Sequence, residues 1–191
     1  MRILLLTSFY PPEVRSISTM MRQLAHGLSQ RGHQVTVLTP VAKDNLPREA
    51  QNQRFAPVTA EGAVSVVRFD IPGRRTSNYL LRGFNELISP VYYRRAIGKW
   101  VAGPIDGVIV YTPHFPLTQV GAWVKHRYKA RYLLNIQDIF PRNAIDAGIM
   151  KNKALISFYE HFERLAYRSA DSITTRTSSS EPASQAAPAA P

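Results

Sequence analysis

The chain begins with apolar runs and helical patterns that alternate as they do in α/β proteins. Residues 2–7 are almost entirely apolar and run into the segment Ser8-Phe-Tyr-Pro-Pro, as a strand buried on both faces does. Apolar residues then recur at one-face helical spacing from Ile17 to Leu28, and Gly32 stands where a helix C-cap is expected. Residues 34–39 predict a second strand. Strand, helix and strand in this order predict a right-handed parallel crossover.

The same alternation continues along the chain to residue 177. Four further strands are predicted at residues 64–70, 106–112, 131–138 and 171–177, and helical periodicity fills residues 117–128 and 155–166. Repeated units of this kind predict an α/β fold with a doubly wound, mostly parallel, Rossmann-like sheet, whose functional loops lie at the carboxyl ends of the strands. We expect one domain over residues 1–177. Residues 178–191 contain only Ser, Glu, Pro, Ala and Gln, and predict a disordered tail.

Charge and cysteine content narrow the classes of partner and of chemistry. Lys and Arg number 24 against 13 acidic residues, a formal net charge of +11, which favours phosphate-bearing partners or an anionic membrane. Nucleic acid is not favoured, because no helix-turn-helix, zinc-finger or RNP-like motif is present. The absence of cysteine excludes disulfides and thiolate chemistry, and the five histidines lack zinc-site spacing. We therefore expect no metal and no other cofactor.

The hydrophobic runs also bear on localisation. The first run stops at Leu6 and prolines follow, whereas a signal-peptide core needs roughly 7 to 15 apolar residues. No stretch approaches the roughly 20 apolar residues of a spanning helix. We expect a cytoplasmic protein whose membrane contact, where it occurs, is peripheral and on the inner face of the cytoplasmic membrane.

The loop after the first strand is the first candidate for binding chemistry. In a doubly wound sheet this loop commonly receives a ligand phosphate, because backbone N–H groups and the positive end of the next helix point there. Residues 8–16 contain no glycine, so the dinucleotide fingerprint and the P-loop are both absent. The segment instead offers Glu13, Arg15 and Ser16 as substrate-binding candidates. Alternatively, Glu13 complements the helix dipole and Arg15 is a solvated loop charge.

Several segments spread along the chain carry a resemblance to a known family. Tyr10-Pro-Pro-Glu13 and the helix end Leu28-Ser-Gln-Arg-Gly32-His33-Gln-Val-Thr-Val-Leu-Thr39 resemble the N-terminal half of GT-B, family 4 glycosyltransferases. Later segments are similar, in order, to those of the subgroup that builds bacterial surface polysaccharides. They are Asn135-Ile-Gln-Asp138-Ile-Phe-Pro141, Gly148-Ile-Met-Lys-Asn152 and Phe162-Glu-Arg-Leu-Ala-Tyr-Arg-Ser-Ala170-Asp171. The resemblance covers residues 1–177 and is specific through the joint order of its segments.

The resemblance implies a retaining hexosyl transfer from a nucleotide-sugar donor to a lipid-linked or polysaccharide acceptor, without a required metal. The N-terminal domain of such enzymes holds mainly the acceptor. The family usually has glycine where this chain has Arg15 and Ser16, and a bulky Arg can crowd that space. The family's second domain, with its Glu-x7-Glu motif, has no counterpart here. We therefore expect a truncated, acceptor-binding half that is inactive alone; the alternative is a non-catalytic, stand-alone membrane-binding or acceptor-binding module, or a partner subunit.

Two loops further along the chain hold the catalytic candidates. Asp138 ends the fifth predicted strand just before Pro141, and in a glycosyltransferase it would bind the acceptor or take the proton of the attacking hydroxyl. His114 follows the fourth strand and could hydrogen-bond a sugar hydroxyl or act as a base. The alternatives are an Asp that caps its turn and a loop histidine without function. Arg142 completes the substrate-binding candidates.

A basic and aromatic stretch spans residues 72–100. It contains a single acidic residue, Glu86, among many tyrosines and cations. Such a composition favours contact with anionic phospholipid or with a lipid diphosphate acceptor, although a solvated helix face would have the same composition. The predicted membrane-surface residues are Arg74, Arg75, Arg82, Arg94, Arg95, Lys99 and Trp100.

Overall fold

The computed structural model describes residues 1–41, 46–50, 52, 54–72, 79–112, 115–136, 145, 148 and 151–175. Within these ranges the strands are β1 (Arg2–Leu6), β2 (Gln34–Pro40), β3 (Val58–Glu61), β4 (Val64–Phe69), β5 (Gly107–Thr112), β6 (Arg131–Ile136) and β7 (Ser172–Thr175). The helices are α1 (Ser16–Gln30), α2 (Tyr79–Trp100), α3 (Phe115–Tyr128) and α5 (Lys153–Ser169), with a short 3-10 turn, η2, at Arg48–Ala50. The expected tail, residues 178–191, lies outside the described residues.

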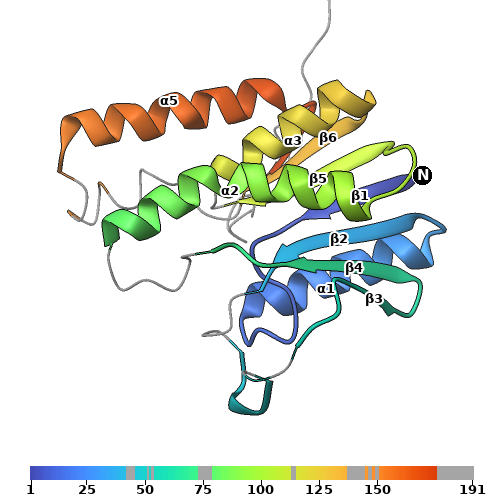
Figure 1. Ribbon diagram of the computed structural model, residues 1–191. Helices are drawn as coiled ribbons and strands as arrows, with labels where there is room; N and C mark the ends of the chain where they lie inside the picture. Colours follow the sequence, from blue (N-terminus) through green and yellow to red (C-terminus); the bar gives the residue numbers. More distant parts are fainter. Residues whose placement is uncertain are drawn as a thin grey trace, which may run out of the picture.

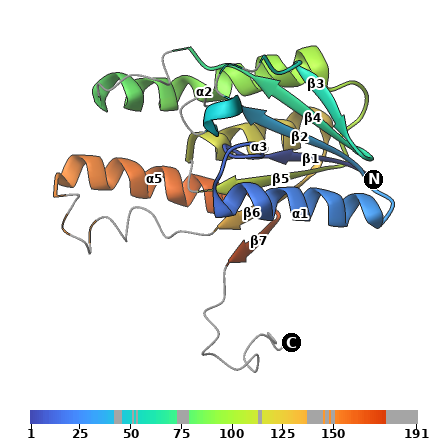
Figure 2. The same ribbon diagram turned by 90° about the horizontal axis from the view of Figure 1, so that it is seen from below.

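The strands form one sheet in the order β3-β4-β2-β1-β5-β6-β7 (Figure 1). The pairs β1–β2, β1–β5, β2–β4, β5–β6 and β6–β7 are parallel, and β3 alone among the described strands runs antiparallel, to β4. Helix α1 covers one face of the sheet, and α2, α3 and α5 cover the other (Figure 2). The predicted doubly wound, mostly parallel α/β fold is confirmed.

Helix α1 forms and ends as its sequence predicts. Its apolar stripe, with Met21 and Ala25 fully buried, packs on the valines of β2 and β4. The chain then leaves the helix through Gly32, whose φ of 81° is a left-handed conformation that glycine adopts without strain. The N–H of His33 donates to the carbonyl of Leu28 and that of Gly32 to Ser29, the hydrogen-bond pattern of a helix C-cap.

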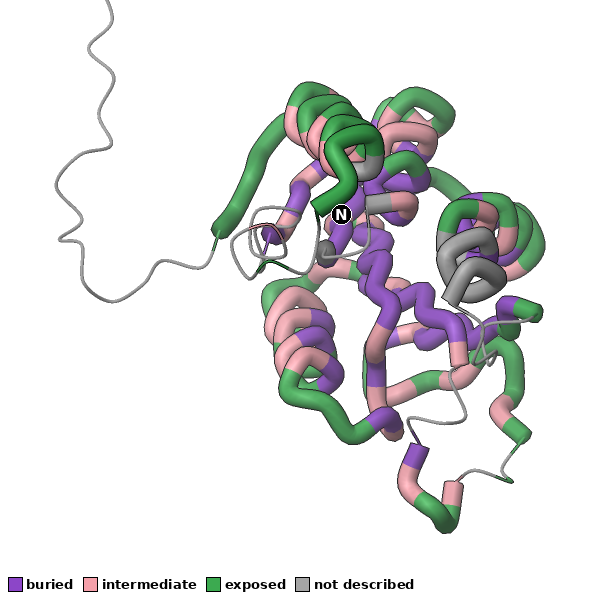
Figure 3. Tube along the Cα trace, turned by 90° about the vertical axis from the view of Figure 1, so that its left-hand side faces the viewer, coloured by how far each residue is buried: buried purple, intermediate pink, exposed green. Residues whose placement is uncertain are grey.

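The opposite face of the sheet carries the larger core. Leucines and valines of β1, β5 and β6 pack there against α2, α3 and α5. The buried parts of the chain are concentrated in the strands at the centre of the molecule (Figure 3). Helix α3 approaches the sheet at Gly121, where an added Cβ would lie 2.6 Å from atoms of Val110 and Tyr132. The absence of a side chain at this position is what lets α3 pack so closely on β5 and β6.

Asp171 links α3 to β6 beside the edge strand β7. Its carboxylate accepts hydrogen bonds from the N–H of Tyr132 at 2.8 Å and from the Nζ of Lys125 at 2.6 Å. The Lys125 hydrogen bond, together with that from Tyr132, holds the pKa of the Asp171 carboxyl below its usual range. The Ala-Asp pair that ends the last family-like segment therefore links α3 to β6 at the entry to β7.

Besides the short turn η2, one strand and one helix were not predicted. Strand β3 has only four residues, whose burial alternates weakly at the sheet edge, so its sequence shows no strand-like apolar run. Helix α2 replaces part of the expected basic surface with core: Tyr93 and Ile97 are 1% and 0% exposed. The interpretation of residues 72–100 as a surface is therefore wrong for this buried side of the helix.

No helix in the described part of the chain is long and apolar enough to cross a membrane.

Two helix glycines in contrasting surroundings test the packing of α3. Gly121→Ala should lower the free energy of unfolding by about 1–3 kcal/mol, because the new methyl group collides with Tyr132 and Val110. Gly98→Ala in α2 meets no atom within 4 Å and should raise that free energy by about 0.5–1 kcal/mol, because alanine is the better helix former. Urea unfolding of both variants measures the difference; shifts of the same sign would contradict this packing.

Candidate functional site

The order of the strands places the switch point of this doubly wound sheet between β1 and β5. Strand β1 pairs with β2 on one side and with β5 on the other. The connection after β1 enters α1 on one face, while the connection after β5 leads to α3 on the opposite face. Loops that diverge in this way leave a ligand crevice beyond the carboxyl ends of the two strands. Residues 7–15, called the first loop below, lie at this point (Figure 1).

The first loop has a defined backbone. The N–H of Thr7 donates to the carbonyl of Leu38 in β2 at 3.2 Å, and the N–H of Phe9 donates to Thr7 Oγ1, also at 3.2 Å. A turn follows, in which the N–H of Glu13 donates to the carbonyl of Tyr10 and that of Arg15 to Glu13. The peptide bond between Pro11 and Pro12 is cis.

The structure separates the three candidate residues of this loop. Glu13 is buried, at 5% exposure, and does not belong to the first turn of α1. Arg15 and Ser16 are exposed at the start of α1, where Arg15 is the N-cap residue and its guanidinium lies 5.0 Å from the centre of the Phe9 ring. The side chain of Arg15 makes no capping hydrogen bond to this helix end, and the first turn of the helix holds no acidic residue. The positive end of the helix dipole at this point favours an anion.

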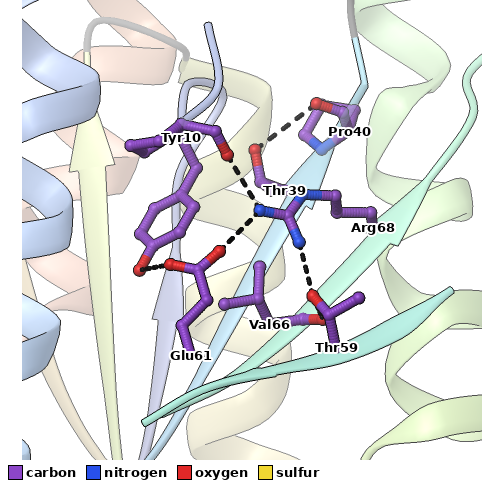
Figure 4. Close-up of polar contacts among 8 residues, drawn as sticks. Tyr10, Thr39, Pro40, Thr59, Glu61, Val66 and Arg68 are labelled. Carbon is purple, nitrogen blue, oxygen red and sulfur yellow. Dashed lines mark hydrogen bonds and ion pairs between the residues drawn. The ribbon is translucent and has the colours of Figure 1, made fainter. Parts of the chain in front are cut away.

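A buried arginine beside the first loop was missed by sequence reasoning (Figure 4). Arg68 in β4 is 8% exposed, and its guanidinium donates to Thr59 Oγ1 at 2.6 Å, to the carbonyl of Pro11 at 2.8 Å and to Glu61 Oε1 at 2.9 Å. Thr59 and Glu61 both belong to β3. The signal that could have revealed Arg68 is a single cation in an otherwise apolar strand, because a charge is rarely buried without a partner.

Two aromatic rings complete the surroundings of Arg68. Its Cζ atom lies 5.9 Å from the centre of the Tyr10 ring and 5.6 Å from that of Phe55, within cation–π range. The Tyr10 hydroxyl donates to Glu61 Oε2 at 3.4 Å. Burial, followed by the charge of Glu61, raises the pKa of the Tyr10 phenol above its ordinary value. Tyr10 therefore stays a protonated donor at neutral pH, and the Arg68 charge is already balanced by Glu61.

The structure describes only some of the remaining predicted site residues. His114, Asp138, Arg142, Arg74 and Arg75 lie outside the described residues, and Arg82 lies in α2 without a described side chain. Arg94, Arg95 and Lys99 are exposed on α2, and Trp100 is half-buried. Within the described ranges, no three His, Asp or Glu side chains come together as a metal site would require.

The outer surface of α2 and α3 combines cations with aromatic rings. The guanidinium of Arg94 lies 5.5 Å from the centre of the Trp123 ring in α3, and the ammonium of Lys99 lies 4.8 Å from that of Trp100. Leu87 and Val91 lie about two turns and one turn before Arg94, and they are 49% and 46% exposed. Between Leu87 and Lys99 the exposed side of α2 therefore holds both apolar and basic side chains.

The comparisons with known proteins agree with this architecture. Residues 16–183 match the family model of the glycosyl transferase 4-like domain. The chain belongs to this family. No curated protein matches the sequence. Among solved structures, the fold is similar to that of sucrose-phosphate synthase from Thermosynechococcus elongatus, with a TM-score of 0.59 and 11% sequence identity. It is also similar to that of UGT2 from Phytolacca americana in its apo form, with a TM-score of 0.54 and 14% identity.

The extent of these matches defines what the domain is. They cover 90% and 92% of this chain but only 41% and 45% of the two solved structures, so the chain spans less than half the length of either. At such low identity the likeness concerns the fold alone. The chain is thus a glycosyl transferase 4-like domain whose fold is that of the N-terminal domain of GT-B glycosyltransferases.

Proposed function

We propose that the chain is the acceptor-binding half of a retaining family 4 glycosyltransferase of the surface-polysaccharide subgroup. It acts on a nucleotide-sugar donor, held with a C-terminal domain or a partner chain, and on a lipid-linked or polysaccharide acceptor. The observation that carries this proposal is the start of α1, where Arg15 and Ser16 are exposed and where the strand connections diverge. A cation, a hydroxyl and the positive end of a helix dipole at one place suit a diphosphate group.

We assign a separate role in substrate binding to each residue near this helix end. Arg68 is paired with Glu61, and we assign the binding of an acceptor phosphate to Arg15, which is an exposed cation of the first loop. Ser16 offers its hydroxyl at the first position of the helix. Glu13 is buried, which supports a part in shaping the loop around the substrate in place of direct contact. Arg142 adds a second cation from the connection after β6.

The two arginines at opposite ends of α1 provide a matched test. Isothermal titration of the chain with inorganic diphosphate should show binding that Arg15→Gln weakens about tenfold, since a charge-assisted hydrogen bond contributes about 1.5–3 kcal/mol. Arg31→Gln removes the same charge from an equally exposed arginine at the helix C-cap and should change the affinity by less than about twofold. Equal losses in both variants, or no binding by the unaltered chain, would contradict the proposed site.

Catalysis in the assembled enzyme is proposed to use Asp138 and His114. Asp138 would take the proton of the attacking acceptor hydroxyl, and His114 would hydrogen-bond a sugar hydroxyl or serve as a second base. Both residues follow strands that end at the carboxyl edge, the same edge as the first loop. In the proposed scheme the acceptor phosphate is bound at α1 and the reacting hydroxyl lies nearer β5 and β6.

Substitution of Asp138 separates catalysis from binding. In an active enzyme that contains this chain and a donor half, Asp138→Asn should lower kcat by about 10²-fold or more, because the amide cannot accept the proton. Diphosphate binding to the chain should stay unchanged in the same variant. Unaltered turnover would remove Asp138 from catalysis and leave it as a turn-capping residue.

A second candidate function is a stand-alone membrane-binding module at the inner face of the cytoplasmic membrane. The observation that favours it is the outer face of α2, where exposed Leu87 and Val91 precede exposed Arg94 and Arg95 on the same side of the helix. Apolar side chains can enter the headgroup region while the neighbouring cations pair with anionic lipid. The two functions are compatible, since a lipid-linked acceptor resides in the membrane.

Vesicle sedimentation distinguishes a specific membrane face from general attraction by net charge. Replacing Arg94, Arg95 and Lys99 together by Gln should weaken binding to anionic phospholipid vesicles about 100-fold, at about 1 kcal/mol per basic residue. Replacing the exposed residues Arg22, Arg31 and Arg48 by Gln removes an equal charge from α1 and η2 and should weaken binding far less. Equal effects of the two triple variants, or equal binding to neutral vesicles, would count against a membrane face.

A further inference from the structure

We propose that Arg68 of β4 and Tyr93 of α2 are positioning residues that hold the first loop from opposite faces of the sheet. They fix where the loop presents Arg15 and Ser16, and β3 serves this purpose by completing the coordination of Arg68. The inference rests on the proposed function only in taking Arg15 and Ser16 as the acceptor-binding pair. The hold on the loop itself is a separate and measurable property.

The two contacts bracket a short part of the loop. The hydroxyl of Tyr93 donates to the carbonyl of Thr7 at 2.9 Å, and the guanidinium of Arg68 donates to the carbonyl of Pro11 at 2.8 Å. Tyr93 reaches the loop from the face that α2 covers. Arg68 lies on the α1 face, since it follows Val64 and Val66 at alternate positions of β4. Residues 8–10 therefore lie between two side-chain donors that come from opposite directions.

The loop needs such contacts because its own backbone offers few ties to the sheet. Pro11 and Pro12 have no N–H to donate. The backbone N–H groups of Phe9, Glu13 and Arg15 donate to acceptors within the loop, and these bonds define its local shape. They do not define where that shape sits relative to β2, β4 and α2. The bond of the Thr7 N–H to β2 and the bonds from Tyr93 and Arg68 contribute to this placement.

Arginine has the geometry that this position requires. A planar guanidinium can donate to several acceptors at once, whereas a lysine ammonium is a point charge on a flexible stem. Arg68 uses one nitrogen for Thr59 and another for both Pro11 and Glu61. Thr59 and Glu61 are alternate residues of β3 and so point to the same side of that strand. Without β3 the guanidinium would lose two of these three acceptors.

Tyr10 connects the core beneath α1 with the Arg68–Glu61 pair. Its ring is 2% exposed in the core beneath α1, and its hydroxyl donates to the carboxylate that pairs with Arg68. The residue before Pro11 is thus seated in the core while the carbonyl of Pro11 is bound by Arg68. Movement of the loop away from the sheet would have to break both contacts together.

Amide hydrogen exchange on the full chain measures this hold directly. In Arg68→Met, exchange at the Phe9, Glu13 and Arg15 amides should rise about tenfold more than at the amides of β1 and β5, because the loop opens without global unfolding. Arg68→Lys should give a smaller rise of the same selectivity. Tyr93→Phe removes only the hydroxyl bond to Thr7 and should affect Phe9 more than Arg15.

Val66→Ala is the matched control, since it destabilises the same strand through a lost core contact and leaves both donors in place. It should raise exchange in the loop and in the strands by similar factors. The proposal is overturned if Arg68→Met loosens the loop no more than the strands, or if Val66→Ala is equally selective. Should Arg68→Met fail to fold, Arg68→Lys and Tyr93→Phe decide the same question.

Diphosphate titration of the same variants links the hold to binding. Arg68→Lys and Tyr93→Phe should each weaken diphosphate binding by about threefold to tenfold, while Val66→Ala at a temperature where it is fully folded should not. Unchanged affinity in both positioning variants would overturn the link between loop placement and presentation of Arg15. If the unaltered chain binds no diphosphate, the proposed function fails, and the exchange result still decides whether the loop is held.

Discussion

The parallel pairing of β1 with both β2 and β5 determines how the rest of the molecule is arranged. Parallel neighbours cannot be joined by a tight turn, so each connection must cross a face of the sheet, and right-handed crossovers fix which face. Since the chain winds in one direction from β1 to β4 and in the other from β5 to β7, α1 lies on one face and α2, α3 and α5 on the other. The same constraint brings the first loop to the point where the two windings meet.

Sequence patterns predict those parts of the fold in which one physical signal dominates. The strands buried on both faces are apolar runs, and α1 has one apolar stripe and a glycine at its end. Helix α2 was not predicted from its sequence pattern, because Pro90 lies in its interior and its buried positions include Asn85 and Ser89 as well as Tyr93. Strand β3 forms at an edge through pairing with β4 and contacts with Arg68. Such contacts depend on tertiary structure, which no local pattern contains.

The same distinction applies to the candidate site. Arg15 and Ser16 could be proposed from sequence because the start of the helix after a first strand is a known place for anions. The group around Arg68 could not, since Tyr10, Thr59, Glu61 and Arg68 come together only when the β3–β4 hairpin pairs beside the first loop. The sequence contains 24 Lys and Arg residues, and in the fold the charge of Arg68, one of them, is balanced by Glu61. The number of basic residues therefore overstates the number of cations available to a ligand.

The position of Tyr93 relates the two proposed surfaces to one another. Its hydroxyl contacts Thr7 at the carboxyl end of β1, so this turn of α2 lies level with the ligand edge of the sheet. Leu87 and Val91 precede Tyr93 by six and two residues and are exposed on the outer side of the same helix. Under the proposed function, a membrane that receives these apolar side chains would lie beside the edge that holds Arg15 and Ser16. A lipid-linked acceptor could then keep its chain in the bilayer while its diphosphate reaches the start of α1, which explains why a basic, amphipathic α2 and an anion-attracting α1 occur in one domain.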